Sequence, residues 1–332
     1  MSESGTRHAA QLRSGVVVIG RNEGERLKRC ISSVTAATIV YVDSGSSDGS
    51  AQWALDYGVE VIKLDPRCPF TAARARNSGF RRLQTIASGI SYVQFVDADC
   101  ELISNWPEQA ISFLDAHADV GVVFGHLRER VPERSIYNWL CDQEWGGAEG
   151  EARACGGIAM MRVDALDEVG GYRDDLIAGE EPELCVRLRA AGWRIWRLEN
   201  EMAMHDAAMI RFSQWWRRAV RTGYAFAQGA YLHGGKPERH RVWESRRAWL
   251  WGLWLPLACL GAGLAFGPWG WATWLIYPLQ ILRQTMRNRG PLNQRALMAL
   301  FQVLARFPEA WGQIRFMRDR LLGRQARLIE YE

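Results

Sequence analysis

The sequence lacks several motifs that would have indicated a function directly. Its seven cysteines are scattered and form no Cys-x-x-Cys pair, which argues against a structural zinc site and against a disulfide framework. There is no P-loop, and Gly20–Gly24 does not fit the Gly-x-Gly-x-x-Gly dinucleotide fingerprint. Residues 1–14 are polar and lack the apolar core of a signal peptide, so we expect a disordered N-terminus and a globular part in the reducing cytoplasm.

Charge is unevenly distributed along the chain. The net charge of the 332 residues is only +4, but from Leu232 onward Lys and Arg number 15 against 6 Asp and Glu, and the preceding part carries 26 against 31. The hydrophobic content is 48%, and there are 16 tryptophans. A slightly acidic body followed by a basic, apolar tail is typical of a protein at a membrane surface and not of a nucleic-acid binder.

Buried strands and helices alternate in the first part of the chain. Apolar runs predict five strands, at residues 16–19, 39–42, 59–64, 92–96 and 120–124. Helical patterns predict helices at residues 25–34, 72–83 and 106–117. This order predicts an α/β fold in which helices flank a mostly parallel sheet. We place this domain at residues 15–232 and a helical, membrane-associated region at residues 233–332.

Two carboxylates, Asp97 and Asp99, follow the strand at residues 92–96. In an extended chain their i, i+2 spacing directs both side chains the same way. Paired carboxylate oxygens at a strand end suit Mg²⁺ or Mn²⁺, with a diphosphate completing the coordination. The alternative is a solvated Asp turn without a ligand, because aspartate is common in turns.

Other polar side chains follow the predicted strands in the same way. Asn22, Asp43 and Asp48 come after the first two strands, and ligands of open α/β sheets bind beyond the carboxyl ends of the strands. Carboxylates repel a bare nucleotide, so they must hydrogen-bond its hydroxyls and base edges or hold a metal ion. The pattern therefore predicts a carboxylate-rich site at this edge of the sheet.

Four motifs in order resemble a known family. They are Val16–Glu23 (VVIGRNE), Val42–Ser50 (VDSGSSDGS), Phe95–Asp99 (FVDAD), and Gly170–Tyr172 (GGY) together with Gly179–Trp193. The combination resembles the family 2 glycosyltransferases of GT-A fold over roughly residues 14–229. The resemblance implies a nucleotide-diphosphate-sugar donor, most simply a UDP-sugar, and Mn²⁺ or Mg²⁺ as cofactor.

The resemblance also implies roles on the donor side. Asn22, Glu23, Asp43 and Asp48 would contact the nucleotide, and the alternative for Asp48 is an Asx turn before a helix. Asp97 and Asp99 would hold the metal-bound diphosphate. Arg76 would contact a phosphate through its fork of N–H donors.

Glu180 and Glu181 are the candidates for the general base. An inverting transferase needs one base to take the proton of the acceptor hydroxyl. Pro182 fits the first position of a helix that continues to Ala190, which would place Glu181 at or next to the helix N-cap. The family pattern usually has Glu-Asp here, with Asp as base. We expect Glu181 to be the base and Glu180 to be the alternative.

His205 and Arg217 are further candidates. His205 follows the predicted strand at residues 194–198, and Asp206 could orient its ring; a metal or diphosphate contact and a structural role are both open. Gln214 and Arg217 match part of the Gln-x-x-Arg-Trp motif of processive synthases, but Arg218 replaces the Trp. The chain is therefore expected to be non-processive. Arg217 is left as a phosphate clamp or a solvated helix face near a membrane.

The acceptor side is predicted from glycines and tryptophans. Residues 156–161 read as a strand whose glycines, Gly156 and Gly157, allow a ligand to approach. Residues 139–151 read as an acceptor loop, with Trp145 as the sugar-stacking candidate.

The C-terminal region contains 35 uncharged residues, from Ala248 to Leu282, which Gly267–Gly270 interrupts. Arginines flank the run on both sides, which predicts that both ends lie on the cytoplasmic side of a membrane. A re-entrant hairpin fits better than a single crossing, and a buried helical hairpin is the alternative. Residues 294–325 are predicted to form a basic, interfacial amphipathic helix.

Together these patterns predict an inverting, metal-dependent hexosyltransferase on the cytoplasmic face of a membrane. It would transfer sugar to a lipid-linked or glycan acceptor and bind no nucleic acid. One alternative is a polyprenyl-phosphate sugar transferase. The other is a catalytically silent module that binds a nucleotide sugar or lipid.

Overall fold

The computed structural model describes residues 13–36 and 38–324, and these divide into two compact units, residues up to Ile210 and residues from Arg211 on. Most of the predicted disordered segment, residues 1–14, lies outside the described residues. The predicted boundary at residues 232–233 stays a prediction; helix α9, which was assigned to the first domain, lies in the second unit.

The first unit is built around one mixed sheet. Its strands are β1 (Ser14–Gly20), β2 (Thr38–Asp43), β3 (Glu60–Lys63), β4 (Tyr92–Asp97), β5 (Cys100–Leu102), β6 (Val120–Glu129), β7 (Gly150–Ala152), β8 (Ala159–Arg162) and β9 (Arg194–His205). Along the sheet their order is β3-β2-β1-β4-β8-β6-β9-β5, with β7 also on β9. The half made of β3, β2, β1 and β4 is parallel. In the other half β8 runs antiparallel to both β4 and β6. The predicted parallel sheet is thus confirmed for the half that carries the first three motifs.

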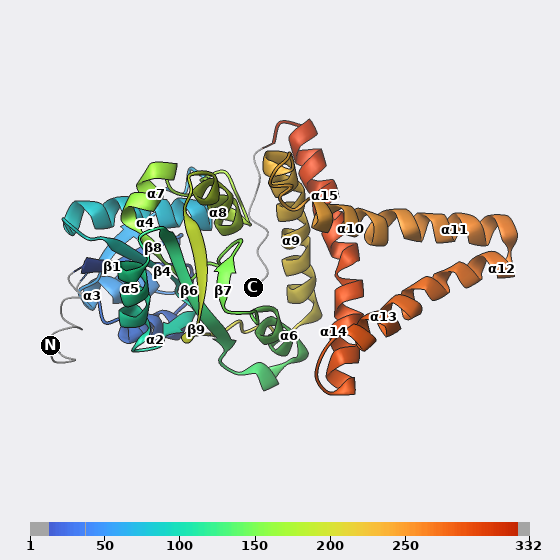
Figure 1. Cartoon of the computed structure of the whole chain (residues 1–332), viewed down its shortest axis with the longest axis horizontal. Coiled ribbons are helices and arrows are strands. Elements are labelled where there is room, and N and C mark those ends of the chain that lie inside the picture. Colours follow the sequence, from blue (N-terminus) through green and yellow to red (C-terminus); the bar gives the residue numbers. More distant parts are fainter. Residues whose placement is uncertain (1–12, 37, 325–332) are drawn as a thin grey trace. The chain divides into compact units, whose positions relative to one another are not determined.

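Helices cover both faces of this sheet (Figure 1). The face covered by α2 (Glu25–Ser33), α3 (Ser50–Asp56) and α5 (Trp106–Ala116) buries one core cluster, which includes Leu27, Trp106 and Leu114. The opposite face buries a second cluster under α4 (Ala72–Ile86), α7 (Val163–Val169) and α8 (Glu180–Ala190). Alternate residues of β1 divide between the two clusters, Val16 and Val18 to one and Val17 and Ile19 to the other, as the two-residue period of a strand requires.

The structure corrects three predicted elements of the first unit. Residues 139–151 are only partly a loop, because α6 (Ile136–Glu144) begins at a Ser135 side-chain cap. The strand predicted at residues 156–161 starts only at Ala159. Helix α8 begins at Glu180 and not at Pro182.

The second unit is helical. Its helices are α9 (Phe212–His233), α10 (Val242–Trp249), α11 (Leu255–Phe266), α12 (Pro268–Trp271), α13 (Ile276–Arg287), α14 (Leu292–Leu304) and α15 (Arg306–Leu321). Helices α9 and α15 lie side by side (Figure 1). They pack closely because Gly223 has no side chain. A Cβ at this position would lie only 2.0 Å from the Glu309 carbonyl oxygen. The structure has two helices, α14 and α15, where the sequence predicted one amphipathic helix at residues 294–325.

Helices α10 to α13 form the predicted apolar hairpin. A π-helical turn, Leu250–Trp254, joins α10 to α11 into one rod, and the chain reverses at Gly267, whose φ of +57° favours glycine. Figure 1 shows α13 running back from α12 at an angle to this rod. Several large apolar side chains of the hairpin are exposed, including Leu264, Phe266, Trp269 and Leu279. Among the described residues one helix, Val242–Phe266 with 25 residues, is long and apolar enough to cross a membrane.

Candidate active site

A buried arginine connects three of the predicted acidic residues. Arg76, on α4, is 2% exposed. Its Nη2 donates to Asp97 Oδ1 at 2.8 Å, and its Nη1 donates to Glu180 Oε1 at 2.9 Å and lies 3.0 Å from Glu181 Oε1. Burial alone would lower the pKa of Arg76, but the surrounding carboxylates raise it well above its usual range. The guanidinium thus holds the acidic cluster together, and a contact of Arg76 with phosphate stays a prediction.

Glu181 has an unusual affinity for protons within this cluster. Burial, followed by the neighbouring charge of Glu180, raises the pKa of Glu181 to about 7, although Arg76 opposes the change. Both glutamates lie in the first turn of α8, after Gly179 in the left-handed conformation. A carboxylate with a pKa near 7 can accept a proton at neutral pH and is driven to do so more strongly than an ordinary carboxylate.

The backbone at Gly157 passes directly over these groups. A Cβ on Gly157 would lie 2.5 Å from Asp97 Oδ2, 2.6 Å from Arg76 Nη2 and 3.2 Å from Glu181 Oε1. The absence of a side chain at Gly157 therefore lets the Asp97 and Arg76 side chains lie close to the backbone. A Cβ on Gly156 would meet nothing within 4 Å. Binding of an acceptor by either glycine stays a prediction.

The second aspartate has different partners. Ala98 and Asp99 form a turn between β4 and β5. The sequence analysis assumed an extended chain at this position, and the structure does not have one. Asp97 contacts Arg76, whereas Asp99 Oδ2 lies 3.2 Å from His205 Nε2. Burial by itself would raise the pKa of Asp99, but His205 lowers it to about 2. Burial, only partly offset by Arg76, raises the pKa of Asp97.

His205 lies between two carboxylates. Its Nε2 faces Asp99, and its Nδ1 lies 3.2 Å from Glu129 Oε2. Burial would lower the pKa of His205, but Asp99 and Glu129 raise it to about 10. Asp206, the sequence candidate for orienting the ring, contacts Arg29 at 3.1 Å, and Glu129 contacts the ring instead.

The side chains of Asp99, Cys100 and His205 form a group that could hold a metal ion, with donor atoms within 4.8 Å of one another. Two ligands at right angles on an ion with bonds of about 2.1 Å lie about 3.0 Å apart, and the Asp99 and His205 atoms are 3.2 Å apart. The donor geometry therefore fits a divalent metal at Asp99 and His205.

On the donor side, hydrogen bonds hold the loop after β2. Asp43 Oδ2 accepts from the backbone N–H groups of Gly45 and Ser46, at 3.1 and 3.0 Å. Asn22, with a φ of +56°, accepts from the Ser47 N–H at 2.8 Å. Both predicted donor residues thus lie where β1 and β2 end, and they shape one loop.

Two other predicted donor residues have local partners. Asp48 accepts from both the N–H and the hydroxyl of Ser50, as expected for the Asx-turn alternative. Glu23 forms an ion pair with Arg26 at 2.7 Å. Nucleotide contacts by Asp48 and Glu23 stay predictions.

Trp145 follows α6, and its ring and the His205 ring meet edge to face, with centroids 4.6 Å apart. The predicted acceptor residue is thus a neighbour of the candidate metal ligand. Arg217 is exposed on α9, in the second unit, and its donor contact stays a prediction.

Sequence reasoning missed Glu129. It lies at the end of β6 and pairs with His205, 76 residues further along the chain. No local signal marked it, because it stands among charged residues of the kind that usually cover a surface.

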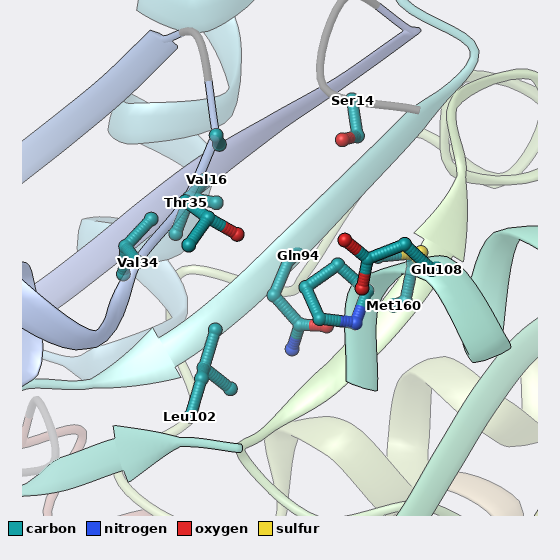
Figure 2. Close-up of a pocket in the computed structure, with 10 residues that line it drawn as sticks. Ser14, Val16, Val34, Thr35, Gln94, Leu102, Glu108 and Met160 are labelled. Atoms are coloured by element: carbon teal, nitrogen blue, oxygen red, sulfur yellow. The ribbon is translucent and has the colours of Figure 1, made fainter. Parts of the chain in front are cut away.

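A small cavity lies elsewhere in the first unit (Figure 2). Its volume is about 10 Å³ and its lining includes Thr35, Gln94, Leu102 and Glu108, so it has room for no more than one water molecule. None of the predicted site residues lines it, and it is too small for a substrate.

Comparison with known proteins finds a family that matches the N-terminal part of the chain. Residues 15–170 match the family described as Glycosyl transferase family 2. This part of the chain is therefore similar to the family 2 glycosyltransferases. This confirms the predicted resemblance, and the matched range includes the three N-terminal motifs and Gly170.

Two curated proteins are similar to this domain. Glycosyltransferase AglE of Haloferax volcanii is 23% identical over 209 residues, which make up 58% of this chain and 66% of AglE. Succinoglycan biosynthesis protein ExoA of Rhizobium meliloti is 26% identical over 188 residues, 53% of this chain and 56% of ExoA. The chain therefore matches less than two thirds of the length of either relative.

The fold also resembles a solved structure. Mannosyltransferase PcManGT from Pyrobaculum calidifontis, in complex with GDP-Man and Mn²⁺, has a TM-score of 0.58 and 21% sequence identity; the match covers 93% of this chain and 88% of that chain. This likeness confirms the predicted GT-A fold.

Proposed function

We propose that this protein is an inverting, metal-dependent glycosyltransferase that moves a sugar from a nucleotide-diphosphate donor to an acceptor hydroxyl. The observation that carries the proposal is Glu181, a carboxylate with a pKa near 7 that Arg76 holds beside Asp97. Such a group can take a proton at neutral pH.

In the proposed reaction, Glu181 accepts the proton of the acceptor hydroxyl while the hydroxyl oxygen forms a bond to the anomeric carbon. The bond from this carbon to the diphosphate oxygen breaks on the opposite side, so the configuration inverts. The proton ends on Glu181 and the negative charge on the nucleoside diphosphate. Arg76 keeps Glu181 in place and stays protonated throughout.

Asp99 and His205 would hold the metal ion, which would neutralise the charge of the departing diphosphate. Imidazole in the ligand set favours Mn²⁺ over Mg²⁺, since Mg²⁺ prefers oxygen ligands. The similar mannosyltransferase is described with Mn²⁺, which supports the same choice. The distance between the two donor atoms, 3.2 Å, is compatible with both on one ion.

The donor would lie over the loop that Asp43 and Asn22 shape. We expected a UDP-sugar, and the similar mannosyltransferase is described with GDP-Man, so the test includes both nucleotides. The hydrogen bonds that Asp43 accepts from Gly45 and Ser46 use one of its oxygens. The Oδ1 atom, which contacts the Tyr41 hydroxyl at 3.2 Å, would also bind the ribose or base.

We further propose that the hairpin of the second unit anchors the protein to a membrane by entering and returning on the same side. Residues 268–282 of the return arm are uncharged, and at a rise of 1.5 Å per residue they extend about 22 Å, less than the ~30 Å hydrocarbon core. Arg283 and Arg287 follow this arm, and Arg246 and Arg247 precede the first one. Positive charges at both ends favour the cytoplasmic face.

A membrane anchor favours a lipid-linked acceptor, and the relative named for succinoglycan biosynthesis supports a glycan product. The test is sugar transfer by the purified protein, with Mn²⁺ or with EDTA, from a panel of UDP- and GDP-sugars. The acceptors are lipid-linked saccharides in a membrane extract and polyprenyl phosphate alone. We expect Mn²⁺-dependent transfer to the saccharide, with inverted configuration in the NMR spectrum of the product.

Retained configuration would refute the proposed base. Transfer only to polyprenyl phosphate would instead identify a polyprenyl-phosphate sugar transferase. Binding of nucleotide sugar without any release of nucleotide would identify a catalytically silent module.

A further inference from the structure

Glu129 is a buried carboxylate at the end of β6, 3% exposed. Its Oε1 accepts from Asn138 Nδ2 at 3.1 Å, and both oxygens lie within 3.3 Å of the Ala207 N–H. Its Oε2 lies 3.2 Å from His205 Nδ1. Asn138 on α6 and Ala207 after β9 therefore fix the Glu129 carboxylate, with its Oε2 toward Nδ1 of the His205 ring.

This contact determines which ring nitrogen of His205 is available. An ionised carboxylate only accepts hydrogen bonds, so Nδ1 must carry the proton that it shares with Glu129. Nε2, which faces Asp99 at 3.2 Å, is then the ring nitrogen that would bind a metal ion in place of its proton. A carboxylate behind a metal-binding histidine fixes both the tautomer and the orientation of the ring.

We propose that Glu129 is the positioning residue of the metal site, and that it holds His205 with Nε2 toward the ion. This proposal rests on the metal site of the proposed function. Glu129 does not contact the metal or the substrate; it acts through His205. Glu129 thus holds Nδ1 of the His205 ring, and the opposite nitrogen, Nε2, is directed toward the candidate ion site.

The alternative is that Glu129 only receives hydrogen bonds from Asn138 and Ala207 and stabilises the fold. A second alternative is that it attracts a cation merely by its charge. Glu101 is a suitable control for the second alternative, because it lies on β5 opposite Met204, the residue before His205. It is partly exposed and pairs with Arg29 at 2.9 Å, and it also pairs with Arg130.

The experiment measures Mn²⁺ affinity of the full-length protein in detergent, from the EPR signal of free Mn²⁺, with no nucleotide or acceptor present. Glu129→Gln keeps the size of the side chain and leaves an oxygen for Asn138. We expect its Kd for Mn²⁺ to rise about 10- to 100-fold, as when an outer-shell partner of a ligand is lost. Glu101→Gln removes the same charge, and we expect a change below about fivefold, the most that an exposed ion pair contributes.

Equal Mn²⁺ affinity of Glu129→Gln and the wild type, with a lowered melting temperature, would overturn the proposal and make Glu129 a structural residue. Equal weakening by Glu129→Gln and Glu101→Gln would also overturn it, because charge alone would then explain the effect. Wild-type protein that binds no Mn²⁺ would refute the metal site itself, and this proposal with it.

A second measurement needs no variant and covers the case in which Glu129→Gln does not fold. Wild-type protein with ¹⁵N-labelled histidine is titrated with Cd²⁺, a diamagnetic probe for the same site. We expect the His205 spectrum to show a protonated Nδ1 and a Cd²⁺-bound Nε2. Cd²⁺ on Nδ1, or a proton on Nε2, would overturn the proposal.

Discussion

Replacing Arg76 by methionine tests the arrangement of the acidic cluster. The change removes a buried guanidinium that contacts Asp97, Glu180 and Glu181, at 2.8 to 3.0 Å. Removing one partner of a buried ion pair typically destabilises a protein by about 3–5 kcal/mol. We expect a loss of that size at pH 8, because three carboxylates then repel each other without a counter-ion.

The loss should depend on pH, because protonation of Glu181 relieves the repulsion. The pKa of Glu181 is about 7 in the folded protein, above its ordinary value of 4.5. The folded state therefore binds more protons than the unfolded state between these values, and stability falls as pH rises through this window. Without Arg76 the folded pKa rises further, so the deficit of the variant should be largest at pH 8 and smallest near pH 5.

Hydrogen exchange of peptides from α8 measures this local stability without requiring the two units to unfold together. The matched control is Arg82→Met on the same helix, where the arginine pairs with Glu60 at the surface and exposed pairs contribute about 0–1 kcal/mol. A deficit in Arg76→Met no larger than in the control, or one that does not change with pH, would refute the proposed role of Arg76.

Three further changes test other parts of the account. Gly157→Ala should destabilise the first unit by about 1–3 kcal/mol, the usual cost of overpacking, while Gly156→Ala, where a Cβ has open space, should leave unfolding unchanged; equal effects of the two would contradict the close approach. Asp99→Asn should abolish Mn²⁺-dependent binding of nucleotide in calorimetry without lowering the melting temperature, and a donor affinity that does not change with EDTA would contradict the metal site. Replacing Phe266 and Trp269, which are 71% and 87% exposed, with aspartate should reduce sedimentation with lipid vesicles more than about tenfold, because each Asp costs about 2.5–3.5 kcal/mol in a bilayer; unchanged sedimentation would contradict insertion of the hairpin tip.

The sequence predicted the sheet well where the pattern was local. The apolar runs that became β1, β2 and β4 are bounded by polar residues, so their position and the acidic residues after them followed directly. The predicted start of α8, at Pro182, is two residues too late. Proline fits anywhere in the first turn of a helix, so Pro182 did not fix the first position. In the structure the helix begins after Gly179, which is in the left-handed conformation.

Partners between distant segments could not be predicted in the same way. Nothing near Arg76 in the sequence shows that it would be buried against glutamates 104 and 105 residues away, and its charge favoured a phosphate contact. Asp206 was the obvious carboxylate for His205 because it is adjacent in sequence. Glu129 took that place because β6 runs beside β9 and ends at the register of His205, a relation that only the sheet topology defines.

The central claim is that Glu181 is the general base, and the most direct test compares the turnover of Glu181→Gln and Glu180→Gln. Glutamine keeps the size of the side chain but cannot accept the proton, so kcat of Glu181→Gln should fall by about 10² to 10⁴, with donor and Mn²⁺ affinity unchanged. Wild-type kcat/KM should rise with pH through about 7, where Glu181 loses its proton, and Glu180→Gln should lose less activity. Near-normal turnover of Glu181→Gln would contradict the account, and an inactive Glu180→Gln beside it would exchange the two roles.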